Sequence, residues 1–283
     1  MAELVSTPFA EGFRFPEGPR WHEGRLYFSD QHDGVVRALA RDGIVEEIVK
    51  VPEGPSGIGW MPDGTMLVVS MQDRKVMRFD GTSLTVHADL WDLAPWHCND
   101  MVVDGVGRAY VGNFGFDLYT EGTAPVSTNI VLVEPDGSAR TAAEELRFPN
   151  GTVITPDGKT LIVGESWAGE LAAFDIGADG SLSNRRCYAK LEGAVPDGIC
   201  LDAEGAIWSA CPMSGRIVRV REGGEMTDTV TVSRKGAFAC MLGGSDRRTL
   251  FICAADESDP DKSAERRGVI ETVDVTVPGA GWP

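Results

Sequence analysis

At corresponding positions of a repeat, three short segments place a carboxylate or carboxamide side chain between a proline and a glycine. They are Pro16-Glu17-Gly18, Pro149-Asn150-Gly151 and Pro196-Asp197-Gly198. Three looser copies have Ser56, Asn99 and Cys240 at the corresponding position. Carboxylate and carboxamide oxygens are the ligands that hard divalent cations prefer. If the fold gathers these side chains, they predict a metal site.

The six marked positions are spaced by 39, 43, 51, 47 and 43 residues, which predicts a repeat architecture. Each unit contains short β-rich runs separated by turns such as Asp63-Gly64 and Pro156-Asp157-Gly158, a pattern typical of antiparallel hairpins. Four such runs per unit match a propeller blade. We predict one all-β domain over residues 1–283, a six-bladed β-propeller with four antiparallel strands per blade. A solenoid is the main alternative.

The last unit has only three predicted strands. We expect residues 3–8 to supply the fourth strand and to close the ring, because closure removes exposed sheet edges. The long spacing of 51 residues corresponds to a loop over residues 113–127, and residues 256–267 read as a solvated surface loop.

A propeller would bring the marked side chains together. The first strand of each blade lines the central channel, so Glu17, Ser56, Asn99, Asn150, Asp197 and Cys240 should meet at one mouth. Without a cation, Glu17 and Asp197 would repel each other. A single Pro-Asp-Gly is usually only a turn, but three in phase favour a metal site.

Composition narrows the classes of function. The net charge of -17 argues against nucleic acid and anionic membranes as partners. We see no secretory signal and no apolar run of membrane-spanning length. The six cysteines are scattered, which indicates reduced thiols and a cytoplasmic protein. We expect a monomer or small homo-oligomer that acts on a small molecule.

The segments Phe15–Trp21, Asn99–Met101, Phe148–Gly151 and Pro196–Asp202 resemble the senescence marker protein/gluconolactonase (regucalcin-like) family, from about Phe13 to the end of the chain. The resemblance implies a six-bladed propeller that hydrolyses lactones with a divalent metal. By resemblance, Glu17, Asn150 and Asp197 would bind the metal, and Asn99 would be a fourth ligand or a substrate contact. Asp197 would be the general base. The metal would be Ca²⁺, with Mg²⁺, Mn²⁺ or Zn²⁺ as alternatives.

Several roles stay open at this stage. Asp100 is the second candidate for the base, unless it only bonds turn amides. His97 stands where the family often has arginine, and it could donate to the substrate or be a wall histidine. Cys211 and Cys240 are expected to be inert packing rather than reactive thiols. The predicted substrate-binding rim consists of Asn113, Phe114, Phe116, Glu165, Trp167 and Met213, together with Asn99.

The reaction also has alternatives. Related organophosphate-hydrolysing propellers share the ligand set, so the same site could act on phosphotriesters or other esters. A calcium-binding or ligand-binding propeller without turnover is a further alternative, because a fold does not fix a function.

Overall fold

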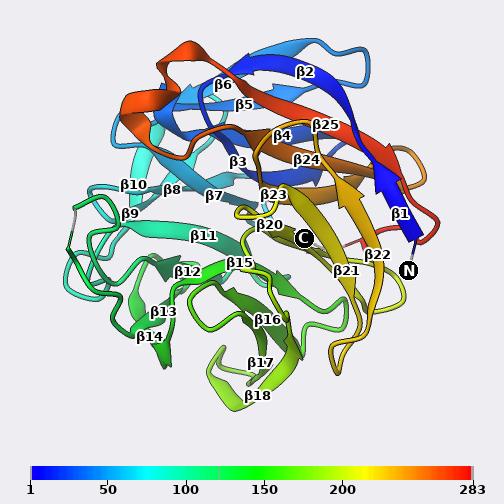
Figure 1. Ribbon diagram of the computed structural model, residues 1–283. Helices are drawn as coiled ribbons and strands as arrows, with labels where there is room; N and C mark the ends of the chain where they lie inside the picture. Colours follow the sequence, from blue (N-terminus) through cyan, green and yellow to red (C-terminus); the bar gives the residue numbers. More distant parts are fainter. Residues whose placement is uncertain (1, 121, 282–283) are drawn as a thin grey trace.

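The computed structural model describes residues 2–120 and 122–281. Six sheets are arranged around one axis, and each blade begins with its innermost strand (Figure 1). The predicted six-bladed β-propeller with four antiparallel strands per blade is confirmed, and one blade carries an additional strand.

The first three blades follow one another in sequence order. Blade 1 contains β3 (Pro16–His22), β4 (Arg25–Asp30), β5 (Val35–Leu39) and β6 (Val45–Lys50), with the short 3₁₀ helix η1 (Gln31–Asp33) after β4. Blade 2 contains β7 (Pro55–Trp60), β8 (Met66–Ser70), β9 (Lys75–Phe79) and β10 (Leu84–Asp89). Blade 3 contains β11 (Cys98–Val103), β12 (Ala109–Asn113), β13 (Thr128–Val133) and β14 (Ala139–Leu146).

Blades 4 to 6 complete the ring. Blade 4 contains β15 (Pro149–Ile154), β16 (Thr160–Glu165), β17 (Glu170–Ile176) and β18 (Leu182–Lys190). Blade 5 contains β19 (Ile199–Leu201), β20 (Ile207–Cys211), β21 (Arg216–Val220) and β22 (Met226–Thr231). Blade 6 contains β23 (Gly236–Gly243), β24 (Thr249–Ala255), β25 (Gly268–Asp274) and β2 (Thr7–Phe13).

The N-terminal segment closes the ring, but the predicted bounds of residues 3–8 were wrong. The closing strand is β2, which pairs antiparallel with β25, whereas β1 (Ala2–Val5) pairs parallel with β22 of blade 5 (Figure 1). The chain changes blade at Ser6, whose hydroxyl donates to the buried Glu271 carboxylate at 2.5 Å and whose amide donates to the Thr231 carbonyl. One N-terminal segment therefore joins two blades.

Small residues let the innermost strands approach closely at the hub. A Cβ added at Gly57 would overlap the Met101 amide nitrogen, and one added at Gly151 would overlap that of Ile199. Glycine is required where one backbone passes this close to another. The glycines of the repeated segments thus set the diameter of the channel.

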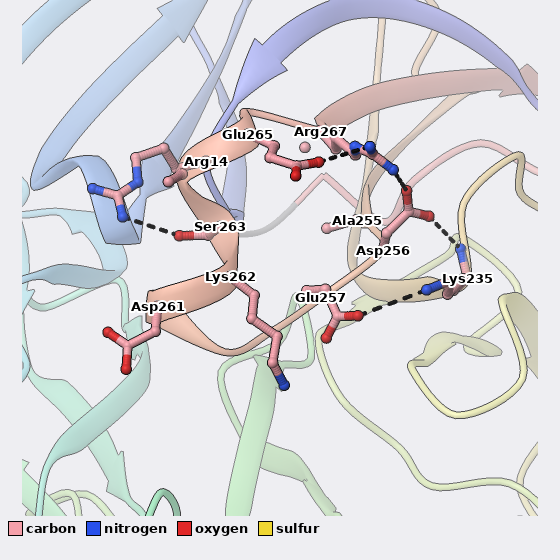
Figure 2. A pocket seen from close by; sticks show the side chains of 12 residues that line it. Arg14, Lys235, Ala255, Asp256, Glu257, Asp261, Lys262, Ser263, Glu265 and Arg267 are labelled. Carbon is pink, nitrogen blue, oxygen red and sulfur yellow. Dashed lines mark hydrogen bonds and ion pairs between the residues drawn. The ribbon is translucent and has the colours of Figure 1, made fainter.

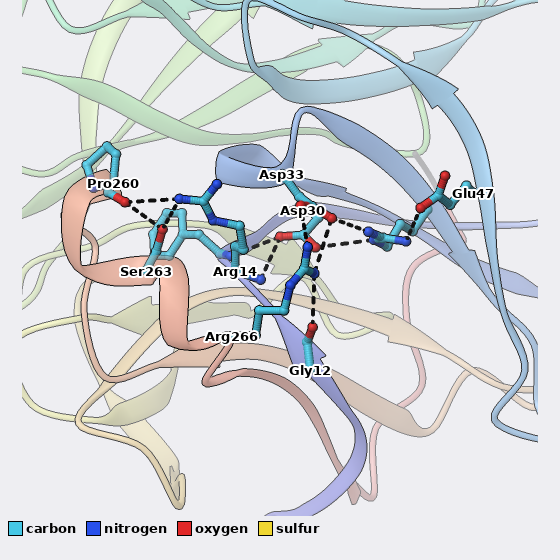
Figure 3. A network of polar contacts seen from close by, with 10 residues as sticks. Gly12, Arg14, Asp30, Asp33, Glu47, Pro260, Ser263 and Arg266 are labelled. Carbon is cyan, nitrogen blue, oxygen red and sulfur yellow. Dashed lines mark hydrogen bonds and ion pairs between the residues drawn. The ribbon is translucent and has the colours of Figure 1, made fainter.

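The segment over residues 256–267 is better ordered than the predicted solvated loop. It contains the 3₁₀ helix η2 (Pro260–Glu265), and its Ser263 is buried. Arg14 donates to the Pro260 carbonyl and to the Ser263 hydroxyl, both at 3.2 Å, and Arg266 pairs with Asp33 at 2.7 Å (Figure 3). The Arg14 contacts tie η2 to the connection that leads from β2 into β3, and the Arg266 pair ties the end of η2 to η1.

The hydrophobic core consists mainly of clusters at the interfaces between blades. The largest fully buried side chains include Trp208, Tyr110 and Phe28. Trp208 lies in the core, whereas Trp60 is only partly buried and stacks on His22 at 4.0 Å. Within residues 2–120 and 122–281, no helix has the length and apolar character needed to cross a membrane.

Candidate active site

The candidate metal ligands lie at β-bulges near the start of the innermost strands. Strand register shifts between Glu17 and Arg20 in blade 1, between Cys98 and Met101 in blade 3, and between Pro149 and Thr152 in blade 4. A bulge re-aims side chains out of the regular alternation of a strand. Glu17, Asn99 and Asn150 consequently line one cavity at the hub.

Hydrogen bonds link these side chains around the channel. Ser56 Oγ lies 3.4 Å from Asn99 Oδ1, and Asn99 Nδ2 donates to Asn150 Oδ1 at 3.2 Å. Asn150 Nδ2 lies 3.3 Å from the hydroxyl of Ser166, which in turn donates to the Pro196 carbonyl at 2.7 Å. Residues from four blades thus hold one another in place around the hub.

Cys240, the sixth marked residue, lines the hub cavity together with Glu17, Asn99 and Asn150, but it is not the register equivalent of Asp197. Gly151 N donates to the Asp197 carbonyl, and the equivalent Gly198 N donates to the Phe238 carbonyl. Phe238, at the bulge of β23, is therefore the counterpart of Asp197, and Cys240 lies two residues further along the strand. Blade 6 lines the hub cavity with Ala239 and Cys240, which carry no side-chain oxygen to serve as a ligand, whereas Phe238 packs against Phe15.

Glu17, which is half-buried, and Asp197, which is buried, form a pair of carboxylates at the hub. Burial raises the pKa of Glu17 to about 8, although the hydrogen bond from the Gly18 amide at 2.9 Å opposes this shift. Burial raises the pKa of Asp197 well above its ordinary value, and the charge of Glu17 raises it further. Each carboxylate therefore disfavours ionisation of the other.

A divalent cation fits this donor set. Two carboxylates balance a double positive charge, and Asn99 and Asn150 can supply carboxamide oxygens. Glu17, Asn99 and Asn150 line a cavity of about 10 Å³, space for roughly one water-sized particle. Within the described residues no three His, Cys, Asp or Glu side chains are grouped to hold a metal, so such a site depends on the two asparagines.

Asp100, the second candidate for the general base, is held in an ion pair. Arg20 Nη2 donates to its two carboxylate oxygens at 2.9 and 3.2 Å, and the Thr152 amide donates to it at 3.1 Å. Both side chains are nearly inaccessible to solvent. These contacts place Asp100 in a bracing position between blades 1, 3 and 4.

His97 belongs to an aromatic group beside the start of β11. Its ring stacks on Trp96 at 5.1 Å, and the Phe114 ring lies 6.1 Å away. Burial lowers the pKa of His97, and the charge of Arg74 lowers it further. The imidazole is therefore neutral near pH 7 and can both donate and accept a hydrogen bond.

Two polar residues of the predicted rim have partners inside the protein. Asn113 is fully buried and donates to both the backbone and the side-chain oxygen of Asn129, at 3.0 and 2.8 Å. The Glu165 carboxylate is also fully buried and accepts from the Arg147 amide at 2.7 Å and from Arg185 at 2.5 Å. Both side chains are therefore bonded within the protein and stabilise the segments that carry the rim.

The apolar rim residues divide into a buried and an exposed group. Phe114 and Phe116 are buried and pack against Phe148, with ring centroids 4.8 and 6.0 Å apart. Trp167, whose ring lies edge-on to Phe148 at 6.0 Å, is 49% exposed, and Met213 is 83% exposed. Trp167 and Met213 are thus accessible to a ligand at the mouth.

Tyr119 is a candidate site residue that the sequence did not reveal. Burial raises the pKa of its phenol to about 12, and the charges of Asp259, Glu17 and Asp197 raise it further. Its oxygen therefore lies within electrostatic reach of both hub carboxylates, although the residue as a whole is 47% exposed. The only sequence signal was the extra length of the loop that carries it.

Burial makes the thiols near the hub unreactive, because it disfavours the thiolate form. Cys240 Sγ lies 3.3 Å from the Trp208 carbonyl and 3.8 Å from Cys200 Sγ, and it is buried. Burial raises the pKa of Cys240 well above its ordinary value and that of Cys211 to about 12. All six cysteines are free.

A larger pocket lies away from the hub, beside η2 on blade 6. It has a volume of about 490 Å³, and none of the candidate metal ligands lines it (Figure 2). Several of its charged side chains pair with one another, as Arg267 does with Glu265 at 2.7 Å and Lys235 with Glu257 at 3.6 Å. We therefore assign the chemistry to the small hub cavity.

Residues 15–256 match the family described as the SMP-30/Gluconolactonase/LRE-like region. The chain belongs to this family. Rabbit (Oryctolagus cuniculus) regucalcin, a relative, is 31% identical over 194 residues, which cover 64% of this chain and 63% of the rabbit protein. Xenopus laevis regucalcin is 26% identical over 288 residues, covering 97% of this chain and 96% of the relative.

Solved structures of the family share the fold. A calcium-binding protein, regucalcin, from Agrobacterium tumefaciens superimposes with a TM-score of 0.82 at 20% identity, covering 100% of this chain and 98% of that one. A gluconolactonase from Xanthomonas campestris gives a TM-score of 0.76 at 23% identity, with 96% and 88% coverage.

Proposed function

We propose that this member of the SMP-30/gluconolactonase family is a metal-dependent lactonase. The observation that carries the proposal is the pair of carboxylates, the half-buried Glu17 and the buried Asp197, beside two asparagines at the hub. Membership of a family named after gluconolactonase points to lactone hydrolysis, and the similar Agrobacterium protein is described as calcium-binding.

Glu17, Asn150 and Asp197 would hold the divalent cation, with Asn99 as a fourth ligand or substrate contact. When bound, the cation supplies polarisation of the lactone carbonyl. Asp197 accepts a proton from the attacking water as the new carbon–oxygen bond forms. The ring carbon–oxygen bond then breaks, and Asp197 returns the proton to the departing alkoxide. Arg20 and Asp100 brace the strands that present these groups.

Chelation and reconstitution test the proposal. Protein treated with EDTA should lose hydrolysis of a lactone panel, and Ca²⁺, Mg²⁺, Mn²⁺ or Zn²⁺ added back singly should restore it. Asp197→Ala should abolish turnover. Hydrolysis at an unchanged rate in EDTA would contradict metal dependence.

A calcium-binding protein without turnover is the second candidate, favoured by the description of the Agrobacterium structure. Calcium binding by calorimetry, without hydrolysis of any lactone, aryl ester or phosphotriester, would support it. Preferred phosphotriester turnover would instead identify the third reaction considered from the sequence.

A further inference from the structure

The mouth of the channel is bordered by exposed apolar side chains from three blades. We define the apolar rim as Leu118, Tyr119, Trp167 and Met213, which are 36%, 47%, 49% and 83% exposed. Leu118 and Tyr119 follow β12, Trp167 follows β16 and Met213 follows β20. These strands end beside the starts of their innermost strands, as the pairs Cys98–Asn113 and Pro149–Glu165 show.

Contacts with the hub fix the rim near the reacting position. Trp167 N donates to the Arg147 carbonyl, and the preceding Ser166 hydroxyl contacts Asn150. The Trp167 ring packs edge-on against Phe148, which stacks on Phe114 at 4.8 Å. Buried aromatic rings therefore support Trp167 from behind, so that the wall exists before a ligand arrives.

Two polar side chains beside this mouth, Asn113 and Glu165, offer little to a polyhydroxylated ligand. The Asn113 side chain already donates to Asn129. The Glu165 carboxylate already accepts from Arg147 and Arg185. Blade 6 lines the hub cavity with Ala239 and Cys240, neither of which carries a side-chain oxygen. A sugar lactone would lose hydration of its hydroxyls here without gaining equivalent partners, which is costly.

We propose that the site selects neutral lactones that carry a hydrocarbon chain, with the chain lying against the apolar rim. This inference rests on the proposed lactonase function. The net charge of -17 further disfavours anionic substrates. Each methylene buried against the rim should improve binding about two- to fourfold.

A chain-length series tests the proposal. The metal-loaded protein is assayed with γ-valerolactone, γ-hexalactone, γ-octalactone and γ-decalactone, and with glucono-δ-lactone. We expect kcat/KM to rise about two- to fourfold per methylene over at least part of the series. Trp167→Ala and Met213→Ser should flatten this dependence. Val106→Ser, which alters an exposed apolar residue in the hairpin between β11 and β12, should leave it unchanged.

Binding of the matching γ-lactams, measured by calorimetry, separates the two proposals. Lactam affinity that rises with chain length and falls in Trp167→Ala supports the apolar rim even if no lactone is hydrolysed, an outcome that would refute only the lactonase function. A flat series in both assays, or at least tenfold preference for glucono-δ-lactone, would overturn the inference while leaving lactonase activity intact.

Discussion

Arg20 of blade 1 and Asp100 of blade 3 form a buried ion pair at 2.9 Å, although 80 residues separate them. Arg20 Nη2 also donates to the Met101 carbonyl at 2.6 Å. The pair therefore connects two blades that are not neighbours along the chain, directly next to Asn99.

Removing the charge of Asp100 should lower the stability of the folded protein. Asp100→Asn leaves Arg20 buried without its counter-ion, and we expect a loss of about 3–5 kcal/mol in the free energy of unfolding, measured in urea. Glu46→Gln, which breaks the exposed pair with Arg25, should cost less than about 1 kcal/mol. Equal effects of the two substitutions would argue against a bracing role for Asp100.

The close approach of the innermost strands should make the stability of the protein sensitive to substitution of their glycines. Gly57→Ala should destabilise the protein by about 1–3 kcal/mol or more, because the new methyl group overlaps the backbone of β11. Gly105→Ala is the matched control, since a Cβ there meets nothing within 4 Å, and its effect should stay within about 0.5 kcal/mol. Thermal and urea unfolding of both variants measures the difference.

His32 should make the protein less stable in acid. Its ring stacks on Phe15 at 4.7 Å, and burial lowers its pKa to about 4, with Arg14 lowering it and Asp259 raising it. Between pH 6.5 and 4 the unfolded chain binds the proton and the folded chain does not. Stability should thus fall as the pH drops through this window, by at most about 1.4 kcal/mol per pH unit.

The variant His32→Phe keeps the stacking and removes the titrating group. Its unfolding free energy should fall less steeply than that of the wild type between pH 6.5 and 4, measured in urea at fixed calcium. Parallel curves for the two proteins would show that His32 is not responsible.

Metal binding should be visible as a change in stability. Calcium at 100 times its dissociation constant should add about 2.7 kcal/mol and raise Tm by several degrees. Glu17→Gln removes one of the two carboxylates and should abolish most of this increase. Val106→Ser should respond as the wild type does, and a Glu17→Gln variant with the full wild-type increase would count against the hub as the metal site.

The repeat made most of this fold predictable, because each unit carries its own turns and its own start signal. The number of blades and the gathering of Glu17, Asn99 and Asn150 follow from that periodicity. Unit six lacks the proline, the glycine and the oxygen-bearing side chain of the repeated segment, so its register was read two residues late, at Cys240 instead of Phe238.

Features set by contacts between distant segments could not be read from the sequence. The split of the N-terminus into β1 and β2 depends on Ser6 meeting Glu271, which is 265 residues away. Likewise, the position of Tyr119 depends on how a long loop crosses the mouth. Neither local propensity nor periodicity contains this information.

The closing strand β2 ends only four residues before Glu17. The first candidate ligand is therefore aligned by the segment that seals the last blade, and the Arg14 contacts with η2 fasten the same connection. Assembly of the hub thus requires that the two distant parts of the polypeptide have already met. Metal binding at the hub would therefore depend on closure of the propeller, and loss of the metal would be an early sign that the closure is unfolding.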